Sequence, residues 1–490
     1  MKITFLIPPA LDGTYDVDRT SGCNYNAYFL PLLPMLHSAT ILKDRIEAVA
    51  ILDFPANKKN RHDLEAFIEK DDSSVYVFYT VFLCQQTDMR VREMIRKKRQ
   101  SGVYFIFSGP QPTFAPEVFL DKSDTFVVRG EPEFITADLV SAINAGSGLG
   151  KVQGVSYYDG RQIIHNHSAG FIADLDKLPI PDRKLLDHRP YYNPKLRTTP
   201  HTAAMASRGC FGRCTFCVPT SLDYARELEH RKSCGRKPPP RMHSAKRVIE
   251  EFRSMAAHGF KSVSLLDDEF LWDDRRTLEI CDGIKDLKLE WSCLCRPDKV
   301  NDAVAKAMKR AGCAYVDLGT ESFDDGVLKA IRKDMTAEDT DNAVKILRHN
   351  GIQVELNVLF GATPVETEKT IRKTLRHLRK LNVDYVLFSI ANPFPGTEFY
   401  DTAKKEGWMY YGDYVPADPA KSAIISYPHL SKKKLEYYVT YAYVSYYLHP
   451  RYLLRQLLHV RGPRDFMQKL STAFKFFRKT FSSERKKGKA

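Results

Sequence analysis

Residues 201–217 read HTAAMASRGCFGRCTFC, and this stretch decides how the rest of the chain is interpreted. Residues 201–207 form a run of small and apolar residues that predicts a short buried strand. Cys210, Cys214 and Cys217 follow the run directly, with three and then two residues between them. Three thiols this close in sequence can bind one metal centre together.

The number of cysteines decides which metal centre the stretch favours. A structural zinc site closes around four ligands, and an ordinary [4Fe–4S] cluster also takes four thiolates. Three cysteines with no fourth nearby therefore favour a cluster with one iron left open. Zinc binding, or cysteines without any metal, is the alternative.

Strand and helix patterns alternate on both sides of this motif. Six candidate strands cover 201–207, 262–266, 290–295, 315–318, 354–360 and 385–390, and helical patterns between them cover 245–258, 275–284, 302–311, 337–350 and 367–381. This series predicts a closed or partial (β/α)6 barrel over 199–398. In such barrels the chemistry lies on the loops that follow the strands.

The amino-terminal region predicts a second α/β unit. Candidate strands at 2–7, 48–52, 74–82, 103–107 and 125–128 alternate with helical patterns such as 88–101. We expect an open parallel Rossmann-like sheet over 1–145, with its ligand beyond the carboxyl ends of the strands. A β-rich connector over 146–198 and a helical extension over 399–490 complete the predicted domains.

Composition sets the broad class of protein. The chain has 490 residues, 43% hydrophobic and 27% charged, which is typical of a soluble globular protein. We expect no membrane-spanning helix and no secretory signal. The ten cysteines lack the density of a disulfide scaffold, so a cytoplasmic location is expected. Of the net charge of +14, residues 451–490 carry +10, so the rest of the chain is nearly balanced.

The cysteine spacing after the first strand of a six-unit barrel resembles the radical S-adenosylmethionine (SAM) enzymes. The resemblance implies that Cys210, Cys214 and Cys217 hold a [4Fe–4S] cluster whose open iron binds the amino and carboxyl groups of SAM. One electron then splits a carbon–sulfur bond and releases a 5′-deoxyadenosyl radical. A low-potential electron donor of the ferredoxin or flavodoxin type is implied as a partner.

Later motifs extend this resemblance, because each stands at the end of a predicted barrel strand. They assign a SAM site to Asp268, Arg296, Glu321, Ser322 and Gly361. Asp268 suits the ammonium group, Arg296 suits a carboxylate, and Glu321 with Ser322 suits the ribose hydroxyls. The alternative is that acids such as Asp268 and Glu321 only cap helices at strand-to-helix turns.

The amino-terminal region together with the barrel resembles the cobalamin-binding members of that family. Loops 108–117 and 127–133 carry the likeness, and they assign a cobalamin site to Gly109, Gln111, Arg129, Gly130 and Glu131. Glycines there would let the backbone approach a large flat ring. The second strand ends in Asp53-Phe54-Pro55 without a histidine two residues later, so no cobalt-ligating histidine is expected from this loop. The alternative is a flavodoxin-like domain that binds nothing.

Two further features leave alternatives open. Cys293 and Cys295 lie two apart on a predicted strand and favour small core fillers over a second metal centre. In the tail, apolar residues share one face of a predicted basic helix. Such a helix suits an anionic membrane surface, which for a cytoplasmic protein is the inner face of the membrane. These residues are Phe466, Leu470, Phe474, Phe477 and Phe481. A solvated helix is the alternative, with nucleic acid a less favoured third.

Together the motifs predict C-methylation of an unactivated carbon in a hydrophobic, lipid-like or tetrapyrrole-like substrate. Ring closure or oxidation on the same scaffold is the first alternative, because only the fate of the substrate radical differs. RNA methylthiolation is less favoured, because such enzymes carry three cysteines in the amino-terminal domain and this chain has only Cys23 and Cys84 there. A non-catalytic cobalamin sensor is disfavoured by the complete cysteine triad.

Overall fold

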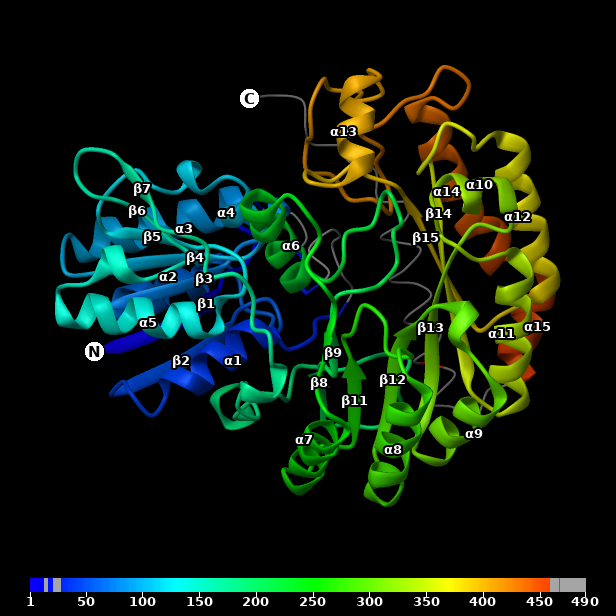
Figure 1. Ribbon diagram of the computed structural model, residues 1–490, viewed down its shortest axis with the longest axis horizontal. Helices are drawn as coiled ribbons and strands as arrows, with labels where there is room; N and C mark the ends of the chain where they lie inside the picture. The colour runs from blue at the N-terminus through cyan, green and yellow to red at the C-terminus, as the bar shows by residue number, and fades with distance from the viewer. Residues whose placement is uncertain (13–15, 21–27, 459–466, 468–490) are drawn as a thin grey trace.

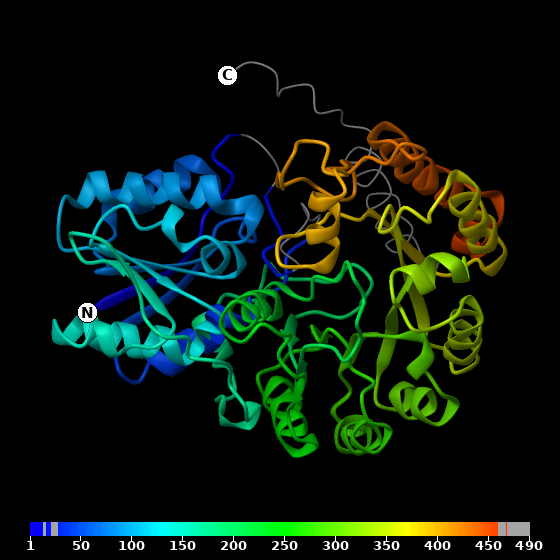
Figure 2. The ribbon, with the colours of Figure 1, turned by 45° about the horizontal axis from the view of Figure 1, so that its top comes forward.

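Two large sheets of the protein lie side by side (Figures 1 and 2), as seen in a computed structural model that describes residues 1–12, 16–20, 28–458 and 467. The amino-terminal sheet and the barrel sheet are separate in the hydrogen-bond pattern. Helix α6 (Ser221–Cys234) lies between them in both views. The predicted combination of an open parallel sheet and a partial barrel is confirmed.

The amino-terminal sheet has the strand order β2-β1-β3-β4-β5-β6-β7. Its strands are β1 (Lys2–Ile7), β2 (Ala48–Asp53), β3 (Val75–Tyr79), β4 (Tyr104–Ser108), β5 (Thr125–Val128), β6 (Val155–Tyr158) and β7 (Ile163–His165). The first five are parallel. Because the chain reverses direction across the sheet between β1 and β3, their carboxyl ends form the switch point where such sheets bind ligands.

The helices of this sheet follow the predicted alternation with shifted ends. They are α1 (Leu33–Leu42), α2 (Arg61–Lys70), α3 (Gln85–Arg99), the short α4 (Pro110–Phe114) and α5 (Pro132–Ala145). The α2 helix begins where the Asn60 side chain accepts hydrogen bonds from the first turn and Asp63 returns one to the Asn60 backbone. This capping box satisfies backbone groups that a helix start otherwise leaves unpaired.

The expected connector over 146–198 divides into two parts. Its hairpin, β6 and β7, pairs antiparallel with β5 and so extends the amino-terminal sheet. Without the hairpin, β5 would expose an unpaired edge. The rest passes from the amino-terminal domain, where the Tyr191 hydroxyl donates to Asp53 (2.7 Å), to the barrel, where the Asn193 side chain donates to Ser264 Oγ (3.1 Å) and Tyr315 Oη (2.7 Å). This segment fixes the base of the barrel.

The barrel sheet is parallel and open, in the order β15-β14-β13-β12-β11-β8. Its strands are β8 (His201–Ala204), β11 (Ser262–Leu265), β12 (Glu290–Cys295), β13 (Cys313–Glu321), β14 (Gln353–Phe360) and β15 (Tyr385–Ile390). Helices α7 (Ala245–Ala257), α8 (Asp274–Ile284), α9 (Asp302–Arg310), α10 (Asp325–Ala330), α11 (Ala337–His349) and α12 (Glu368–Leu381) cover its outer face. The short β9 (Ser207–Arg208) and β10 (Arg241–Met242) pair with each other.

The barrel core contains four cysteines in addition to its aliphatic residues. Cys281, Cys293, Cys295 and Cys313 are buried in the same apolar cluster. The Sγ atoms of Cys293 and Cys295 lie 3.6 Å apart. Their surroundings fit the interpretation as small core residues.

The carboxyl-terminal region covers the open edge of the barrel at β15. It contains α13 (Glu398–Lys405), α14 (Lys432–Tyr447) and α15 (Pro450–Leu458). The Tyr443 hydroxyl accepts from the backbone N–H of Phe388 (3.1 Å) and donates to its carbonyl (2.9 Å). Tyr447 makes the same pair of bonds to Val386. These hydroxyls replace a neighbouring strand at an edge that would otherwise be unpaired.

Two sequence predictions concern membrane-spanning helices and the carboxyl-terminal tail. No helix within the described parts of the chain has the length and apolar character needed to cross a bilayer. The predicted apolar face from Phe466 to Phe481 lies outside the described residues. Cys23 of the amino-terminal region also lies outside them.

Candidate functional site

The cysteine motif forms an irregular loop between β9 and α6. Cys210, Cys214 and Cys217 are each partly exposed on this loop. Gly209 precedes it with φ +85°, and a Cβ there would lie 2.5 Å from a guanidinium nitrogen of Arg226. Only glycine suits both this backbone conformation and this contact.

Cations surround the three thiols. The Gly212 N–H donates to Cys210 Sγ (3.3 Å), and the Cβ position of Gly212 lies 3.8 Å from Cys214 Sγ and 3.5 Å from an Arg296 nitrogen. Burial raises the pKa of all three thiols, and the charges of Lys237, Lys333 and Arg296 oppose that rise. Nearby acids, among them Asp268 and Glu321, add to the rise, so the cations offset it only in part.

The thiols suit a cluster better than a single ion. Within the residues that the structure describes, no three His, Cys, Asp or Glu side chains are grouped so that they could hold one metal ion. In a [4Fe–4S] cluster each thiolate binds a different iron, so the sulfurs need not meet at one point. The donor set, three thiols on one short loop, fits such a cluster.

Backbone bonds attach the loop to the far side of the barrel. The Thr215 N–H donates to the carbonyl of Ile331 (3.1 Å), and Thr215 accepts from the N–H of Phe399 (3.0 Å). The ring of Phe211 packs edge-on against Trp272 at 4.4 Å between centroids. The loop thus spans the open barrel from β9 to α10 and α13.

Three acids follow β11, and all three accept hydrogen bonds from the backbone. Asp267 accepts from Ala206 N (3.2 Å) and Ser207 Oγ (2.6 Å), and burial raises its pKa to about 6. Glu269 accepts from the N–H groups of Leu271 (2.7 Å) and Arg296 (2.5 Å), and burial raises its pKa to about 7.

Asp268 lies between these two acids and contacts both ends of the cysteine loop. Its Oδ2 accepts from Gly209 N (3.1 Å) and its Oδ1 accepts from Thr220 N (2.8 Å). Burial and the adjacent carboxylate of Asp223 raise the pKa of Asp268. The residue assigned by sequence to the SAM ammonium group is therefore already bound to backbone.

The other predicted SAM residues divide into two groups. Glu321 ends β13 with φ +64°, and its Oε1 accepts from the buried Lys333 ammonium (2.8 Å) beside the cysteine loop. Arg296 also lies there, donating to Asp298 (2.9 Å) and to the Lys333 carbonyl (2.7 Å). The structure brings these side chains and the cysteines to one end of the barrel.

Ser322 and Gly361 lie away from that group. Ser322 is buried, and its hydroxyl lies 3.2 Å from Thr374 Oγ1 on α12. A Cβ at Gly361 would lie 3.0 Å from Leu435 of α14, and the carbonyl of Gly361 accepts from Tyr427 Oη (2.9 Å). Both positions are packed against outer elements of the barrel.

The predicted cobalamin loops meet α6 at the carboxyl end of the amino-terminal sheet. Gly109 has φ +104°, and a Cβ there would lie 2.7 Å from the Thr80 carbonyl oxygen. A Cβ at Gly130 would lie 3.4 Å from Glu229 of α6. The packing of the chain against itself therefore already explains why glycine stands at both positions.

The polar residues of these loops are only partly satisfied by protein groups. Arg129 donates to Ser156 Oγ (2.9 Å) and lies 3.4 Å from the Glu229 carboxylate. Gln111 donates to Gln85 Oε1 (2.5 Å), while its own buried Oε1 has no hydrogen-bond partner among the described residues. Such an atom marks a place where a bound amide or hydroxyl would be stabilised.

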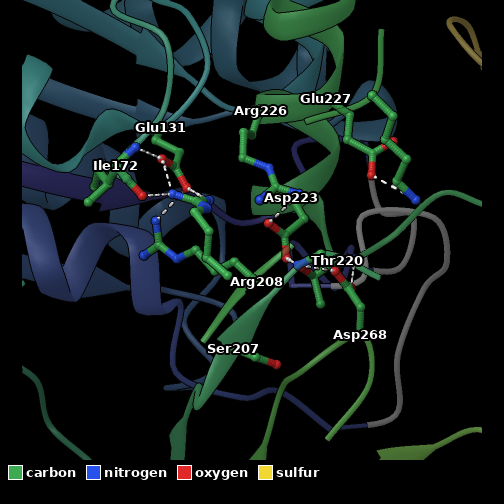
Figure 3. Close-up of polar contacts among 12 residues, drawn as sticks. Glu131, Ile172, Ser207, Arg208, Thr220, Asp223, Arg226, Glu227 and Asp268 are labelled. Atoms are coloured by element: carbon green, nitrogen blue, oxygen red, sulfur yellow. Dashed lines mark hydrogen bonds and ion pairs between the residues drawn. The ribbon is translucent and has the colours of Figure 1, made fainter. Parts of the chain in front are cut away.

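Buried ion pairs join the two domains directly before the cysteine loop (Figure 3). Arg208 of β9 contacts Glu131 (2.9 Å) and Glu133 (2.6 Å) at the start of α5 in the amino-terminal domain, and Arg241 of β10 contacts Glu131 (2.6 Å). Burial opposes ionisation, but the two arginines hold the pKa of Glu131 at about 2. Glu131 is thus a contact between domains, a role that its sequence motif alone did not indicate.

The barrel interior holds polar residues that sequence reasoning did not single out. Asp317 and Asn357, on β13 and β14, are hydrogen-bonded to each other (3.3 Å), and burial raises the pKa of Asp317. Leu387 of β15 is 37% exposed, between the buried Val386 and Phe388. The sequence contains one signal for this polar site. Asp317 is a charged residue within the apolar run of β13, two residues before Gly319.

Residues 205–378 match the family model of the radical SAM superfamily. An uncharacterized methyltransferase of Pyrococcus horikoshii is 29% identical over 470 residues, which cover 94% of this chain and 96% of that protein. The anaerobic magnesium-protoporphyrin IX monomethyl ester cyclase of Cereibacter sphaeroides is 23% identical over 372 residues, 73% of this chain and 57% of that protein. The hopanoid C-3 methylase of Methylococcus capsulatus is 26% identical over 319 residues, 63% and 57%.

Two solved structures share the fold across both sheets. The cobalamin-dependent SAM radical enzyme OxsB, with aqua-cobalamin and SAM bound, superposes with a TM-score of 0.67 at 15% identity, over 92% of this chain and 69% of that chain. The radical SAM methyltransferase TsrM from Kitasatospora setae, with cobalamin and a [4Fe–4S] cluster bound, gives 0.64 at 17% identity, over 89% and 84%.

Proposed function

We propose that this chain, a radical SAM enzyme, binds cobalamin at its amino-terminal sheet and methylates an unactivated carbon of a hydrophobic biosynthetic substrate. The observation that carries the proposal is the placement of the cysteine loop. It begins at β9, whose Arg208 is ion-paired to the amino-terminal domain, and it crosses the open end of the barrel. A cluster on this loop would therefore lie between the two sheets and above the barrel interior.

The chain's residues support the cofactors in different ways. Bound together, the cluster and SAM supply a carbon-centred radical that removes hydrogen from an unactivated C–H bond, and cobalamin supplies the methyl group. We assign cluster binding to Cys210, Cys214 and Cys217. Arg296 and Glu321 lie beside that loop and are suited to the carboxylate and ribose of SAM.

The amino-terminal site is assigned to the carboxyl edge of the sheet. A cavity of about 10 Å³, room for about one water molecule, lies there between residues 17–20 and 29–32 and the ends of β1 and β2 at Ile7 and Asp53. Gln111, with its unpartnered Oε1, lies at the same edge after β4. Of the predicted residues, we retain Gly109, Gln111 and Gly130 as backbone or amide contacts, whereas Arg129 and Glu131 are engaged with α6, β6, β9 and β10.

The barrel interior supports a substrate with a large apolar part. Leu294, Leu359 and Leu387 are the partly exposed apolar positions of β12, β14 and β15. Asp317 and Asn357 lie among them, next to the ion pair between Lys195 and Glu355. This mixture fits a lipid-like or tetrapyrrole-like molecule with an apolar body and some polar groups, and the hopanoid methylase and protoporphyrin ester cyclase named above act on molecules of these two kinds. Ring closure or oxidation is the second candidate, favoured by the cyclase relative.

Anaerobic reconstitution tests this proposal. The wild-type chain should bind about four iron and four sulfide, retain a corrinoid and form 5′-deoxyadenosine from SAM under reduction. Cys214→Ala should abolish that product while the corrinoid remains bound. Extracts of strains with and without the gene should contain compounds that differ by one methylene. Loss of two hydrogens instead would favour ring closure, and undiminished 5′-deoxyadenosine from Cys214→Ala would refute the cluster assignment.

We also propose that the basic carboxyl-terminal region binds an anionic membrane surface. A groove of about 500 Å³ is lined by basic residues of α12 and of the start of α15: Lys373, Arg376, His377, Arg379, Lys380, His449 and Arg451. Leu453, Leu454 and Leu458 of α15 are exposed beside it. The full chain should sediment with phosphatidylglycerol vesicles but not with phosphatidylcholine vesicles. Binding to RNA but to neither vesicle would contradict the proposal.

A further inference from the structure

The two ends of the cysteine loop contact one carboxylate. Gly209 precedes Cys210 directly, and Thr220 follows Cys217 after two residues. The N–H of Gly209 donates to Asp268 Oδ2 (3.1 Å), and the N–H of Thr220 donates to Asp268 Oδ1 (2.8 Å). Figure 3 shows Asp268 beneath Thr220 and Asp223, next to the start of α6.

The neighbouring groups do not replace this contact. Asp223 of α6 also accepts from Gly209 N (2.9 Å) and lies 3.5 Å from Thr220 Oγ1, but within the described parts of the chain the Thr220 N–H donates to Asp268 alone. Asp268 comes from the loop after β11, whereas Gly209, Thr220 and Asp223 belong to the segment that contains the cysteines. Asp268 is therefore the part of this group that ties the cysteine loop to the barrel.

We propose that Asp268 is a positioning residue that holds the two ends of the cysteine loop together and thereby sets the spacing of Cys210, Cys214 and Cys217. Closing a loop costs conformational entropy, and a carboxylate that binds both ends reduces the number of open arrangements. Each of the two hydrogen bonds to Asp268 adds to the stability of the closed loop. The inference rests on the proposed function, because it assigns the loop to cluster binding.

A residue that positions the loop and a residue that contacts the SAM ammonium group act at different stages. A ligand of SAM matters only once SAM is present. A residue that orders the loop affects the loop in the protein without cluster and without SAM. Measurements on the metal-free chain and on the SAM-free cluster protein therefore separate the two roles.

Tryptic cleavage of the full, metal-free chain at Arg213 reports directly on the loop. Arg213 lies between Cys210 and Cys214, and its side chain is 77% exposed. Asp268→Asn replaces one of the two acceptor oxygens by an NH2 group and should raise the rate of cleavage after Arg213 about tenfold, the effect expected for losing one hydrogen bond. Asp273→Asn is the matched control, because Asp273 only caps α8 by accepting from Arg276 N (2.8 Å).

A second pair of variants isolates the backbone donor. Thr220 has φ −49°, close to the range of a proline ring, so Thr220→Pro removes the N–H with little change in backbone conformation. Thr220→Val removes only the hydroxyl. Cleavage at Arg213 should rise in Thr220→Pro and stay near the wild-type rate in Thr220→Val. Equal rates in these two variants, or a wild-type rate in Asp268→Asn, would overturn the proposal.

Cluster retention provides the second measurement. Reconstituted Asp268→Asn, without SAM, should lose iron to a chelator about tenfold faster than the wild type and the Asp273→Asn control. Normal retention and normal cleavage combined with weak SAM binding would assign Asp268 to SAM and refute the positioning role. If the wild type takes up no cluster, the proposed function fails, while the cleavage experiment still decides whether Asp268 orders the loop.

Discussion

Glu131→Gln should loosen the contact between the two sheets. Glu131 is 3% exposed and lies between Arg208 and Arg241, which come from β9 and β10 of the barrel segment. Its Oε2 also accepts from the N–H of Ile172 (2.6 Å). Glutamine keeps the volume of the side chain but removes its charge, so one of the two acids that neutralise the buried arginines is lost.

The size of the effect follows from two independent considerations. Breaking a buried ion pair by removing one partner costs about 3–5 kcal/mol. The pKa of Glu131 lies at about 2 rather than 4.5, and this difference corresponds to about 3 kcal/mol of stabilisation at neutral pH. We therefore expect the free energy of unfolding to fall by about 3 kcal/mol at pH 7, before relaxation of the site.

The pH dependence identifies charge as the cause. The folded-state pKa of Glu131 is lowered, so its contribution is fully present above pH 4.5 and is lost as pH falls towards 2. The difference between wild type and variant should therefore shrink by about 1.4 kcal/mol for each pH unit below 4.5. Urea unfolding of the full chain at several pH values measures this, and hydrogen exchange in β9 and β10 locates it.

Glu117→Gln is the matched control for this experiment. Glu117 is 54% exposed and lies 3.5 Å from His165, so its loss should change the free energy of unfolding by less than about 0.5 kcal/mol. The reasoning is refuted if Glu131→Gln behaves like the control, or if its destabilisation is independent of pH. In either case the ion pairs would not be what fixes the cysteine loop against the amino-terminal sheet.

Two other substitutions test contacts that shape the barrel. Tyr443→Phe removes a hydroxyl that is hydrogen-bonded to both backbone groups of Phe388. Hydrogen exchange of the Phe388 amide should therefore accelerate by about 10- to 100-fold. Tyr437 lies on the exposed side of α14, so the control variant Tyr437→Phe should leave this exchange rate unchanged. Gly209→Ala places a Cβ against Arg226 at a positive φ and should lower iron content after reconstitution together with the thermal midpoint of the metal-free chain. A fully loaded and equally stable Gly209→Ala would show that this contact is not required.

Local patterns were sufficient to predict both sheets and the cysteine loop. Strands such as β1, β15 and β5 have the predicted ends, because each is a short run rich in β-branched or aromatic residues and bounded by turn residues. The spacing of Cys210, Cys214 and Cys217 is likewise a property of adjacent residues. These features depend on side chains that are close in sequence, so they can be read without knowing the fold.

Contacts between distant segments could not be read in this way. Nothing local in the sequence of α14 indicates that Tyr443 and Tyr447 complete the hydrogen bonds of β15, because the edge that needs them exists only when the sheet is formed. Asp268 was assigned to SAM from its position after a strand, whereas its partners Gly209 and Thr220 approach it only through the fold. The chemistry of a carboxylate determines how many hydrogen bonds it can accept. The tertiary structure determines which donors lie within hydrogen-bond distance of it.

The same distinction applies to the join between the domains. The sequence determined that an acidic loop, 131–133, follows β5 and that Arg208 precedes the first cysteine. Only the tertiary structure determined that these charges pair. Removing a charge from water costs free energy, and that cost is offset only when the opposite charge is buried beside it.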